Sequence, residues 1–291
     1  MFEFREIELS DKPWADEHLK FSGNMSCEYS FGNNFIWKGI YDLKVCDTKK
    51  FYLIQNIYGF LFPAGDFDIK TLVDELKKYT ATMNKPLCFS SMSKENSEKL
   101  SEIYGGAITV TSNRDFFDYV YTHESLSTLK GKKLHSKRNH INRFKDNDWS
   151  YETITKENIE ECFQLSRKWC KINECGKNSE MEAEICAVNL GLKNYFDLDF
   201  KGGLLRADGE IQAFTFGEHL TTDTFVVHAE KAFTDFQGAY PTINHEFVKS
   251  ECNGYKFINR EEDNGEPNLR KAKLSYKPEF MVEKFKVIFN S

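Results

Sequence analysis

His228 and Glu230 stand two positions apart in the segment TFVVHAEK, residues 224–231, which has the composition of a β-strand. Side chains two residues apart on a strand point to the same face. A glutamate and a histidine in that relation can act as a base and the group that orients it. The segment therefore predicts a proton-transfer site at the end of this strand.

A second polar cluster, NREED, occupies residues 259–263 and directly follows a predicted strand, YKFIN. The segment between the two strands, PTINHEFVKSE, predicts a helix with Pro241 in its first turn. A strand–helix–strand unit joins parallel strands that end at the same edge of a sheet, where ligands of open sheets bind. We therefore expect both polar clusters at that edge. The alternative is that residues 259–263 form a solvated turn with surface ion pairs.

The stretch GKKLHSKRNHINRFK, residues 131–145, contains six lysines and arginines, two histidines and no acid. In a helix, Leu134, Arg138 and Ile141 fall on one stripe, so Arg138 lies among apolar residues. We expect it to meet a carboxylate, for which the NREED cluster is the candidate, or a ligand phosphate. The other cations form a positive field that could attract RNA, a nucleotide or an anionic lipid, or they lie on the surface with packed stems.

The elements that must position these groups are a mixture of helices and strands. In the first half of the chain, apolar residues over 69–79 recur at helical spacing. The strand-like segment KPLCFSSM follows, and then a helix that opens near Ser93. This order indicates a fold with both element types.

The second half continues the mixed pattern. Residues 159–170 have one apolar helix face, with Thr155 as the candidate N-cap. The dipeptide Asp208-Gly209 separates GLLRA from EIQAFTFGE, which predicts a β-hairpin because this dipeptide accepts positive φ angles. We expect a boundary between two halves near residues 120–132.

The chain has 291 residues, a formal net charge of −6 and 40% hydrophobic residues. This length allows two packed domains or one large one, and the composition indicates a folded globular protein. The N-terminus lacks the basic and apolar regions of a secretory signal, and no apolar run approaches the roughly 18 residues of a membrane span. We therefore expect a cytoplasmic protein without a transmembrane segment.

Eight cysteines are scattered along the chain without any C-x-x-C spacing. This spacing argues against a structural zinc site. Free and mostly buried thiols are expected, as is usual for cytosolic proteins. No metal is predicted at the site.

Four segments carry a family resemblance: GKKLHSKRNHINRF, GGLLRADGEIQAFTFGE, VVHAEKAF with QGAYPTINHEF, and YKFINREEDNGEPNLRKAKLSYKPE. In these segments the chain resembles a bacterial family related to the cytosolic C-terminal domain of phosphatidylglycerol lysyltransferase. The match covers most of residues 130–280 in the expected order. The first half matches more loosely, through SCEYSFGNNFIW and FLFPAGD.

The resemblance implies an α+β protein with mixed sheets, made of two fused acyl-CoA N-acyltransferase-like domains of the Gcn5-related (GNAT) type. The expected N-terminal domain covers residues 1–125, and the C-terminal domain, residues 126–291, carries the site. In such a fold the hairpin supplies the second and third strands, TFVVHAEK the fourth and YKFIN the fifth. The acyl group lies where the fourth and fifth strands diverge. The arrangement is shared with peptidyltransferases that build peptidoglycan bridges from aminoacyl-tRNA.

The chain departs from acetyl-CoA-dependent members in the loop before the predicted helix. Those members hold pyrophosphate with Q/R-x-x-G-x-G/A, because small residues let backbone N–H groups approach phosphate. Here residues 235–240 read DFQGAY, with Asp235 in place of the cation or amide and Tyr240 in place of the small residue. An aminoacyl-tRNA donor therefore fits better than acyl-CoA. The transmembrane part of the lysyltransferase has no counterpart, so a lipid acceptor is not implied.

The leading hypothesis is an aminoacyltransferase that moves an amino acid from tRNA to an amine or hydroxyl of a small-molecule or peptide acceptor, by direct attack. Glu230, oriented by His228, would accept the acceptor's proton. Lys231 or Arg260 would stabilise the oxyanion. No cofactor is expected besides the acyl donor as co-substrate, and no DNA partner is expected.

Eight further residues are expected to bind substrate. The cations would hold donor phosphates, and Glu261 or Asp263 would bind the donor's α-amine. The set is Lys137, Arg138, Arg143, Asn259, Glu261, Asp263, Arg270 and Lys273. The alternatives are an acyl-CoA-dependent N-acyltransferase with an unorthodox phosphate loop, and a non-catalytic binding protein on the same scaffold.

Overall fold

The computed structural model describes residues 2–20 and 22–290. It divides into two compact units. Unit 1 contains the residues up to Asp118, the segment Glu262–Gly265 and the C-terminal residues from Val282, whereas unit 2 contains Tyr119–Glu261 and Glu266–Met281. Each unit is built on a mixed sheet, so the expected α+β class is confirmed.

Unit 2 is built on a sheet with the strand order β14-β8-β13-β12-β11-β10-β9. Strands β12 and β13 run parallel, whereas β9 to β12 pair antiparallel in succession and β13 pairs antiparallel with β8. The strands are β8 (Asp118–Thr122), β9 (Trp149–Thr153), β10 (Lys201–Ala207), β11 (Glu210–Thr221), β12 (Thr224–Ala232), β13 (Phe257–Asn259) and β14 (Phe280–Val282).

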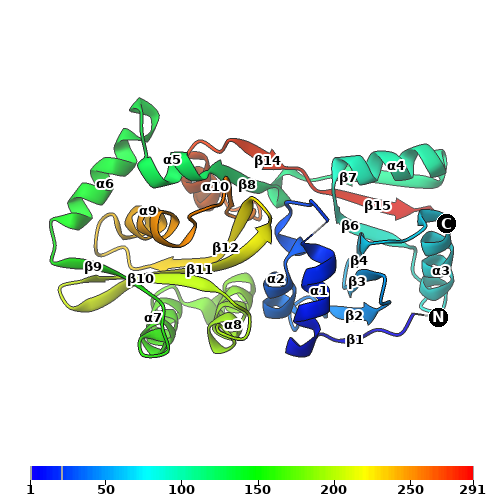
Figure 1. Ribbon diagram of the computed structural model, residues 1–291, viewed down its shortest axis with the longest axis horizontal. Coiled ribbons are helices and arrows are strands. Elements are labelled where there is room, and N and C mark those ends of the chain that lie inside the picture. The colour runs from blue at the N-terminus through cyan, green and yellow to red at the C-terminus, as the bar shows by residue number, and fades with distance from the viewer. Residues whose placement is uncertain (1, 21, 291) are drawn as a thin grey trace. The chain divides into compact units, whose positions relative to one another are not determined.

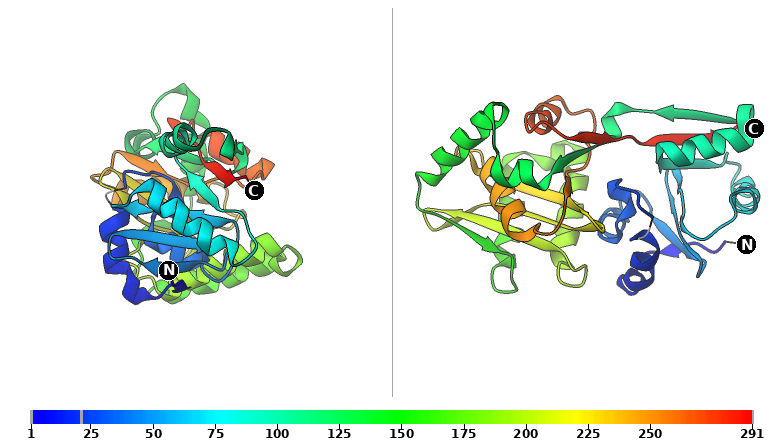
Figure 2. Two further views of the ribbon diagram at one scale, coloured as in Figure 1. Left: turned by 90° about the vertical axis from the view of Figure 1, so that its right-hand side faces the viewer. Right: turned by 45° about the horizontal axis from the view of Figure 1, so that its top comes forward.

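Helices cover both faces of this sheet. Figure 1 shows α9 on one side of β10–β12 and α7 and α8 on the other, and α5 and α6 pack against α9 (Figure 2). Short 3-10 helices are Lys132–Leu134 and Cys175–Lys177. The α-helices are α5 (His123–Thr128), α6 (His135–Lys145), α7 (Ile159–Ile172), α8 (Ser179–Lys193), α9 (Ala239–Glu251) and α10 (Pro267–Leu274).

Local sequence signals predicted the hairpin and the strand–helix–strand unit of unit 2. The hairpin forms between β10 and β11 at Asp208-Gly209. The strand–helix–strand unit is β12–α9–β13, and its two strands are neighbours. The N-cap of α7 is Asn158 and not Thr155, because residues 156–158 form a turn in which the Thr155 N–H donates to Asn158 Oδ1.

Unit 1 is built on a second mixed sheet with the strand order β1-β2-β3-β4-β6-β15-β7, and β5 lies beside β3. Its strands are β1 (Arg5–Glu6), β2 (Lys44–Asp47), β3 (Phe51–Asn56), β4 (Gly59–Leu61), β5 (Ala64–Gly65), β6 (Cys88–Met92), β7 (Ile108–Ser112) and β15 (Phe285–Phe289). Its α-helices are α1 (Lys12–Leu19), α2 (Phe31–Trp37), α3 (Ile69–Ala81) and α4 (Lys94–Tyr104). Its 3-10 helices are Leu9–Asp11, Cys27–Tyr29, Gly105–Ala107 and Arg114–Phe116.

The C-terminal strand β15 belongs to unit 1. It pairs antiparallel with both β6 and β7, which follow one another along the first half of the chain. The sequence predicted a single boundary between residues 125 and 126, with everything after it in one domain. The observed division differs because pairing between strands distant along the chain leaves no local sequence signal.

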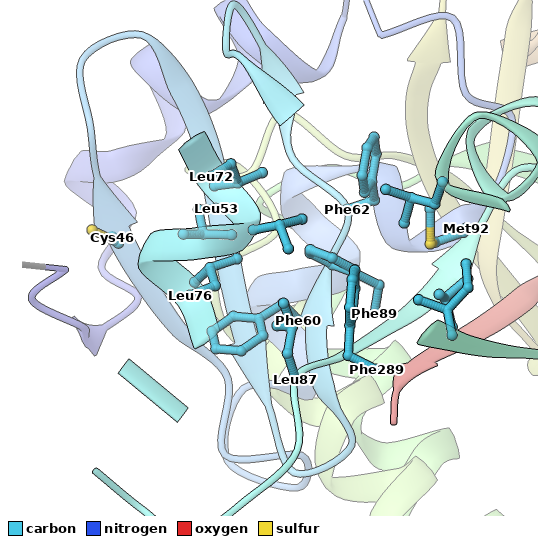
Figure 3. Close-up of a cluster of buried hydrophobic side chains, with 14 residues drawn as sticks. Cys46, Leu53, Phe60, Phe62, Leu72, Leu76, Leu87, Phe89, Met92 and Phe289 are labelled. Atoms are coloured by element: carbon cyan, nitrogen blue, oxygen red, sulfur yellow. The ribbon is translucent and has the colours of Figure 1, made fainter. Parts of the chain in front are cut away.

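The core of unit 1 lies between α3 and its sheet. Leu72 and Leu76 on one face of α3 lie close to Leu53, Phe60 and Phe89 of the strands (Figure 3). These are the apolar positions whose helical spacing the sequence displayed. Helix α4 likewise begins after Ser93, whose side chain accepts a hydrogen bond from the Asn96 N–H.

All eight cysteines are free thiols, and six of them are buried. In the part of the chain that the structure describes, one group of side chains has the spacing of a metal site: Cys27, Asp118 and Glu262 of unit 1. A buried ammonium, Lys284 Nζ, already lies among them. No helix within residues 2–20 and 22–290 is long and apolar enough to cross a membrane.

Lys284 is surrounded by carboxylates within unit 1. Its Nζ lies 2.7 Å from Asp118 Oδ1, 2.9 Å from Glu28 Oε2 and 3.2 Å from Glu262 Oε2. Asp118 is fully buried, and its other oxygen accepts a hydrogen bond from the Cys27 N–H. Burial lowers the pKa of Lys284, but the carboxylates, Asp118 first, outweigh it and hold the pKa well above the ordinary value. The ammonium is therefore the counter-ion of this cluster.

Replacing Lys284 by methionine should destabilise unit 1 by about 3–5 kcal/mol, because a buried carboxylate would lose its counter-ion. Urea unfolding at pH 7 measures the change. Since the pKa of Lys284 is raised by folding, its contribution should be complete below the unfolded pKa and should disappear only as pH rises through the folded pKa. Lys286→Met, at an exposed position of β15, is the matched control and should change stability by less than about 0.5 kcal/mol. Equal stability of the two variants would contradict this assignment.

Candidate active site

Strands β12 and β13 separate after a short parallel ladder. They pair from Thr224 and Phe257 to Val226 and Asn259, and no further. Beyond Asn259 the chain stays with β8, because the Arg260 N–H donates to the Tyr119 carbonyl over 2.9 Å. Strand β12 meanwhile continues to Ala232 beside β11. Glu230 and the residues Asn259–Glu261 thus lie where the strands diverge, as the sequence predicted, whereas Glu262 and Asp263 of the second cluster belong to unit 1.

A β-bulge in β12 separates the predicted pair His228 and Glu230. Phe216 of β11 pairs with Ala229 and Gly217 pairs with Val227, so His228 has no partner in the ladder. Glycine is needed at position 217, since a Cβ there would collide with the Val226 carbonyl. A bulge interrupts the two-residue alternation of a strand. The prediction that His228 orients Glu230 is therefore wrong.

His228 instead forms a buried bridge between two carboxylates. Its Nε2 lies 2.9 Å from Glu218 Oε1 of β11, and its Nδ1 lies 2.8 Å from Glu261 Oε1. Burial lowers the pKa of His228, but the hydrogen bonds with Glu218 and Glu261 outweigh it and raise the pKa to about 9. The imidazole is therefore charged at neutral pH, and both nitrogens are engaged. It clamps the chain after β13 to β12, and Glu261 serves as its partner.

Lys231 points to the other face of the sheet from Glu230. Its Nζ lies 2.6 Å from Glu184 Oε1 of α8 and 4.0 Å from the ring centroid of Trp169 in α7. Consecutive residues on a strand alternate between faces. The predicted use of Lys231 as an oxyanion donor beside Glu230 is therefore wrong.

Glu230 connects the two diverging strands with α9. Its Oε1 lies 3.0 Å from Arg260 Nη2, and its Oε2 accepts a hydrogen bond of 3.1 Å from Asn244 Nδ2. A carboxylate only accepts hydrogen bonds, so the amide nitrogen of Asn244 must face it. Among the described residues, Asn244 Oδ1 and Arg260 Nη1 are buried without a hydrogen-bond partner. This corner therefore offers a donor and an acceptor that the protein itself does not use.

Asn244 was not predicted from the sequence. It lies in α9 and is almost completely buried. In PTINHEFVKSE it follows Ile243 and stands four residues before Val248, so helical spacing places it beside the apolar stripe, which was the available signal. Identifying its partner required the packing of α9 on β12.

Lys137 brings the basic helix α6 to this corner. Its Nζ lies 3.9 Å from the ring centroid of Tyr276, and Arg260 Cζ lies 4.9 Å from the same centroid. Burial and the charge of Arg260 lower the pKa of Lys137 to about 8, against the opposing effect of Glu230. Burial also lowers the pKa of Arg260, but Glu230 and its other neighbours raise it above the usual value. Two cations and one carboxylate therefore share the space around Tyr276.

Arg138 pairs with backbone carbonyls and, among the described residues, with no carboxylate. Its Nη1 donates to the backbone carbonyls of Leu129 and Gly131. Helix α5 ends at Leu129 in a left-handed conformation, which leaves carbonyl groups at this turn without helical partners. Arg138 satisfies them, so the expected carboxylate partner is wrong, and the contact with a ligand phosphate stays a prediction. Arg143 lies exposed on α6.

The remaining predicted binding residues support the loop or lie elsewhere. Lys273 Nζ donates to the carbonyls of Arg260 and Glu261 over 2.7 and 3.2 Å. Asn259 Oδ1 accepts from the Glu261 N–H over 2.7 Å. Asp263 belongs to unit 1, where it lies 3.5 Å from Arg114 Nη1. Arg270 lies partly buried in α10, and its ligand role stays a prediction, as does that of Asp263.

The N-terminus of α9 is covered by α6. Gly238, which precedes α9, has φ +99°, and a Cβ at that position would collide with the His140 carbonyl of α6. Phe144 of α6 packs with Ala239 and Ile243 of α9. A pyrophosphate at a helix N-terminus needs exposed backbone N–H groups. Backbone of α6 lies where such a ligand would approach.

Comparisons with known proteins agree with this fold. A conserved protein of unknown function from Bacteroides thetaiotaomicron has a solved structure that is 35% identical, covers 100% of both chains and has a TM-score of 0.95. L-PGS from Bacillus licheniformis is 14% identical, with 96% of this chain and 91% of that chain covered and a TM-score of 0.66. The second likeness shows a shared fold. Together with the two mixed sheets, it agrees with the expected α+β class.

A curated relative and a family comparison extend the match to sequence. An uncharacterized protein of Mycoplasmoides gallisepticum is 25% identical over 178 residues, which are 58% of this chain and 55% of that protein. The chain therefore spans about half the length of this curated relative. Residues 20–288 match the family described as phosphatidylglycerol lysyltransferase, C-terminal. Because this match covers most of its 291 residues, the chain belongs to that family.

Proposed function

We propose that this chain is an aminoacyltransferase that moves an amino acid from aminoacyl-tRNA to an amine or hydroxyl group of a small-molecule or peptide acceptor. The family's description, a lysyltransferase, supports transfer of an aminoacyl group. The observation that carries the proposal is the corner formed by Glu230 and Arg260. A carboxylate there lies beside a guanidinium whose Nη1 has no partner among the described residues, at the point where β12 and β13 diverge.

The corner supplies what direct acyl transfer requires. As the acceptor attacks the aminoacyl ester, its proton passes to Glu230, and the carbonyl oxygen gains negative charge. Arg260 Nη1 donates a hydrogen bond to that oxygen, in a partly buried environment where a charged donor is most effective. Asn244 keeps Glu230 in place through its own hydrogen bond. No covalent intermediate with the protein is needed.

Two features support tRNA as the donor over acyl-CoA. Lys132, Lys133 and Arg143 are exposed at and before α6 and provide cations for a phosphate backbone. The same helix covers the N-terminus of α9, where the pyrophosphate of CoA would need access. The first feature favours a polyanion, and the second disfavours CoA.

Glu230→Gln should lower the rate of transfer by about 10²–10⁴-fold, because the amide cannot accept the acceptor's proton. The assay measures loss of lysine from lysyl-tRNA, and from a mixture of charged tRNAs, with glycinamide and glycerol as amine and hydroxyl acceptors. The substitution preserves shape and leaves an oxygen to pair with Arg260. Glu210→Gln at an exposed position of β11 is the control and should retain full activity. An unchanged rate for Glu230→Gln would reject its role as the base.

Deacylated tRNA should bind, and its affinity should fall at least tenfold between 50 and 200 mM salt, because phosphate contacts release counterions. Fluorescence anisotropy at several salt concentrations measures this dependence. Lys132→Glu combined with Lys133→Glu should flatten the salt dependence, whereas Lys94→Glu combined with Lys99→Glu on α4 serves as a control of equal charge change. Micromolar binding of CoA would favour an acyl-CoA enzyme. Binding of neither ligand would favour a non-catalytic protein.

A further inference from the structure

Lys137 carries an ammonium group that the protein leaves without an acceptor. Among the described residues, no carboxylate lies within ion-pair distance of its Nζ and no oxygen accepts a hydrogen bond from it; its neighbour is the ring of Tyr276, 3.9 Å away. The side chain is nevertheless partly buried. An ammonium group has three N–H donors, so a ligand oxygen beside Lys137 Nζ would meet donors that no described residue engages.

The surroundings of Lys137 make it a readier proton donor than an ordinary lysine. Burial and the nearby guanidinium of Arg260 lower its pKa to about 8, although Glu230 opposes the effect. At neutral pH the amine therefore still carries its proton. It holds that proton less tightly than a solvated lysine, whose pKa is about 10.4.

Two cations at one ring can perform different tasks. The guanidinium of Arg260, 4.9 Å from the centroid of Tyr276, does not lose a proton in proteins, so it can only stabilise negative charge. The amine of Lys137 can stabilise charge and can also transfer a proton. Direct acyl transfer needs both, because an oxyanion forms first and an alkoxide must then leave.

We propose that Lys137 is the general acid of the transfer reaction and protonates the ribose oxygen that leaves the amino acid. This assignment rests on the function proposed above. The bond between the acceptor's nitrogen or oxygen and the carbonyl carbon forms as the acceptor's proton moves to Glu230. When the oxyanion collapses, the bond between that carbon and the ribose oxygen breaks. The bonding pair stays on the ribose oxygen, which takes a proton from Lys137 Nζ. The proton held by Glu230 then returns to Lys137, and the products are the aminoacylated acceptor and tRNA with a free hydroxyl.

Lys137→Arg separates proton donation from charge. With lysyl-tRNA as donor and glycinamide as acceptor, we expect kcat to fall by about 10²–10³-fold while KM for lysyl-tRNA changes less than threefold, since arginine keeps the charge but not the acidity. The kcat of the parent protein should be constant below pH 8 and should decline above it, as Lys137 loses its proton. In the variant this alkaline decline should be absent. Lys130→Arg, at an exposed position before α6, is the control and should match the parent.

Several outcomes would overturn the assignment. They are an unchanged kcat in Lys137→Arg, an alkaline decline that persists in the variant, or a loss of activity that lies wholly in KM. Lys137→Met tests folding separately, because urea unfolding should show a stable protein when kcat is lost. If the parent protein transfers lysine and Glu230→Gln does not, but Lys137→Arg does, the inference on Lys137 fails while the proposed function stands. If the parent transfers nothing to either acceptor, the proposed function itself fails.

Discussion

The candidate site depends on charged side chains that bridge the gap between β12 and the chain after β13. The two strands share only three residue pairs before they part, so backbone hydrogen bonds cannot hold their ends together. Glu230 reaches Arg260 across the gap, and His228 joins Glu218 of β11 to Glu261. Each bridge is buried or nearly so, where a charge without a partner would be costly. The divergence of the strands and the ion pairs that span it are therefore parts of one arrangement.

Helix α6 contacts two parts of unit 2 that matter for the proposed function. It covers Gly238 and packs on the first turn of α9, the position at which a helix N-terminus would bind a pyrophosphate. By bringing Lys137 beside Tyr276 and Arg260, it adds a second cation to the corner occupied by Glu230. The same eleven-residue helix also presents exposed cations, which under the proposed function would contact the phosphates of the donor.

Unit 1 contains a cluster that resembles a metal site in composition but uses an internal cation. Asp118, Glu262 and Cys27 have the spacing of metal ligands, and Lys284 Nζ lies within 3.4 Å of an atom from each. A lysine held this way supplies positive charge without depending on an ion from solution. The segment that follows Arg260 is thereby anchored at Glu262 within unit 1, while Arg260 itself belongs to unit 2.

Periodicity and turn chemistry, as they stand in the sequence, determined the α+β elements, the β10–β11 hairpin, the parallel β12–α9–β13 unit and the edge at which its polar residues gather. These features follow from neighbours in the chain, whose spacing decides which face a side chain occupies. The partners of those polar residues were decided only by the tertiary structure. The bulge at His228 reversed the alternation of side chains along β12. Backbone carbonyls at the end of α5 became the partners of Arg138. The packing of α6 and α9 brought Lys137 and Asn244 to the corner occupied by Glu230. A bulge and an interhelical contact form only when segments distant along the chain meet. The pKa of a side chain at such a contact depends on how deeply it is buried and on its charged neighbours, and local spacing encodes neither.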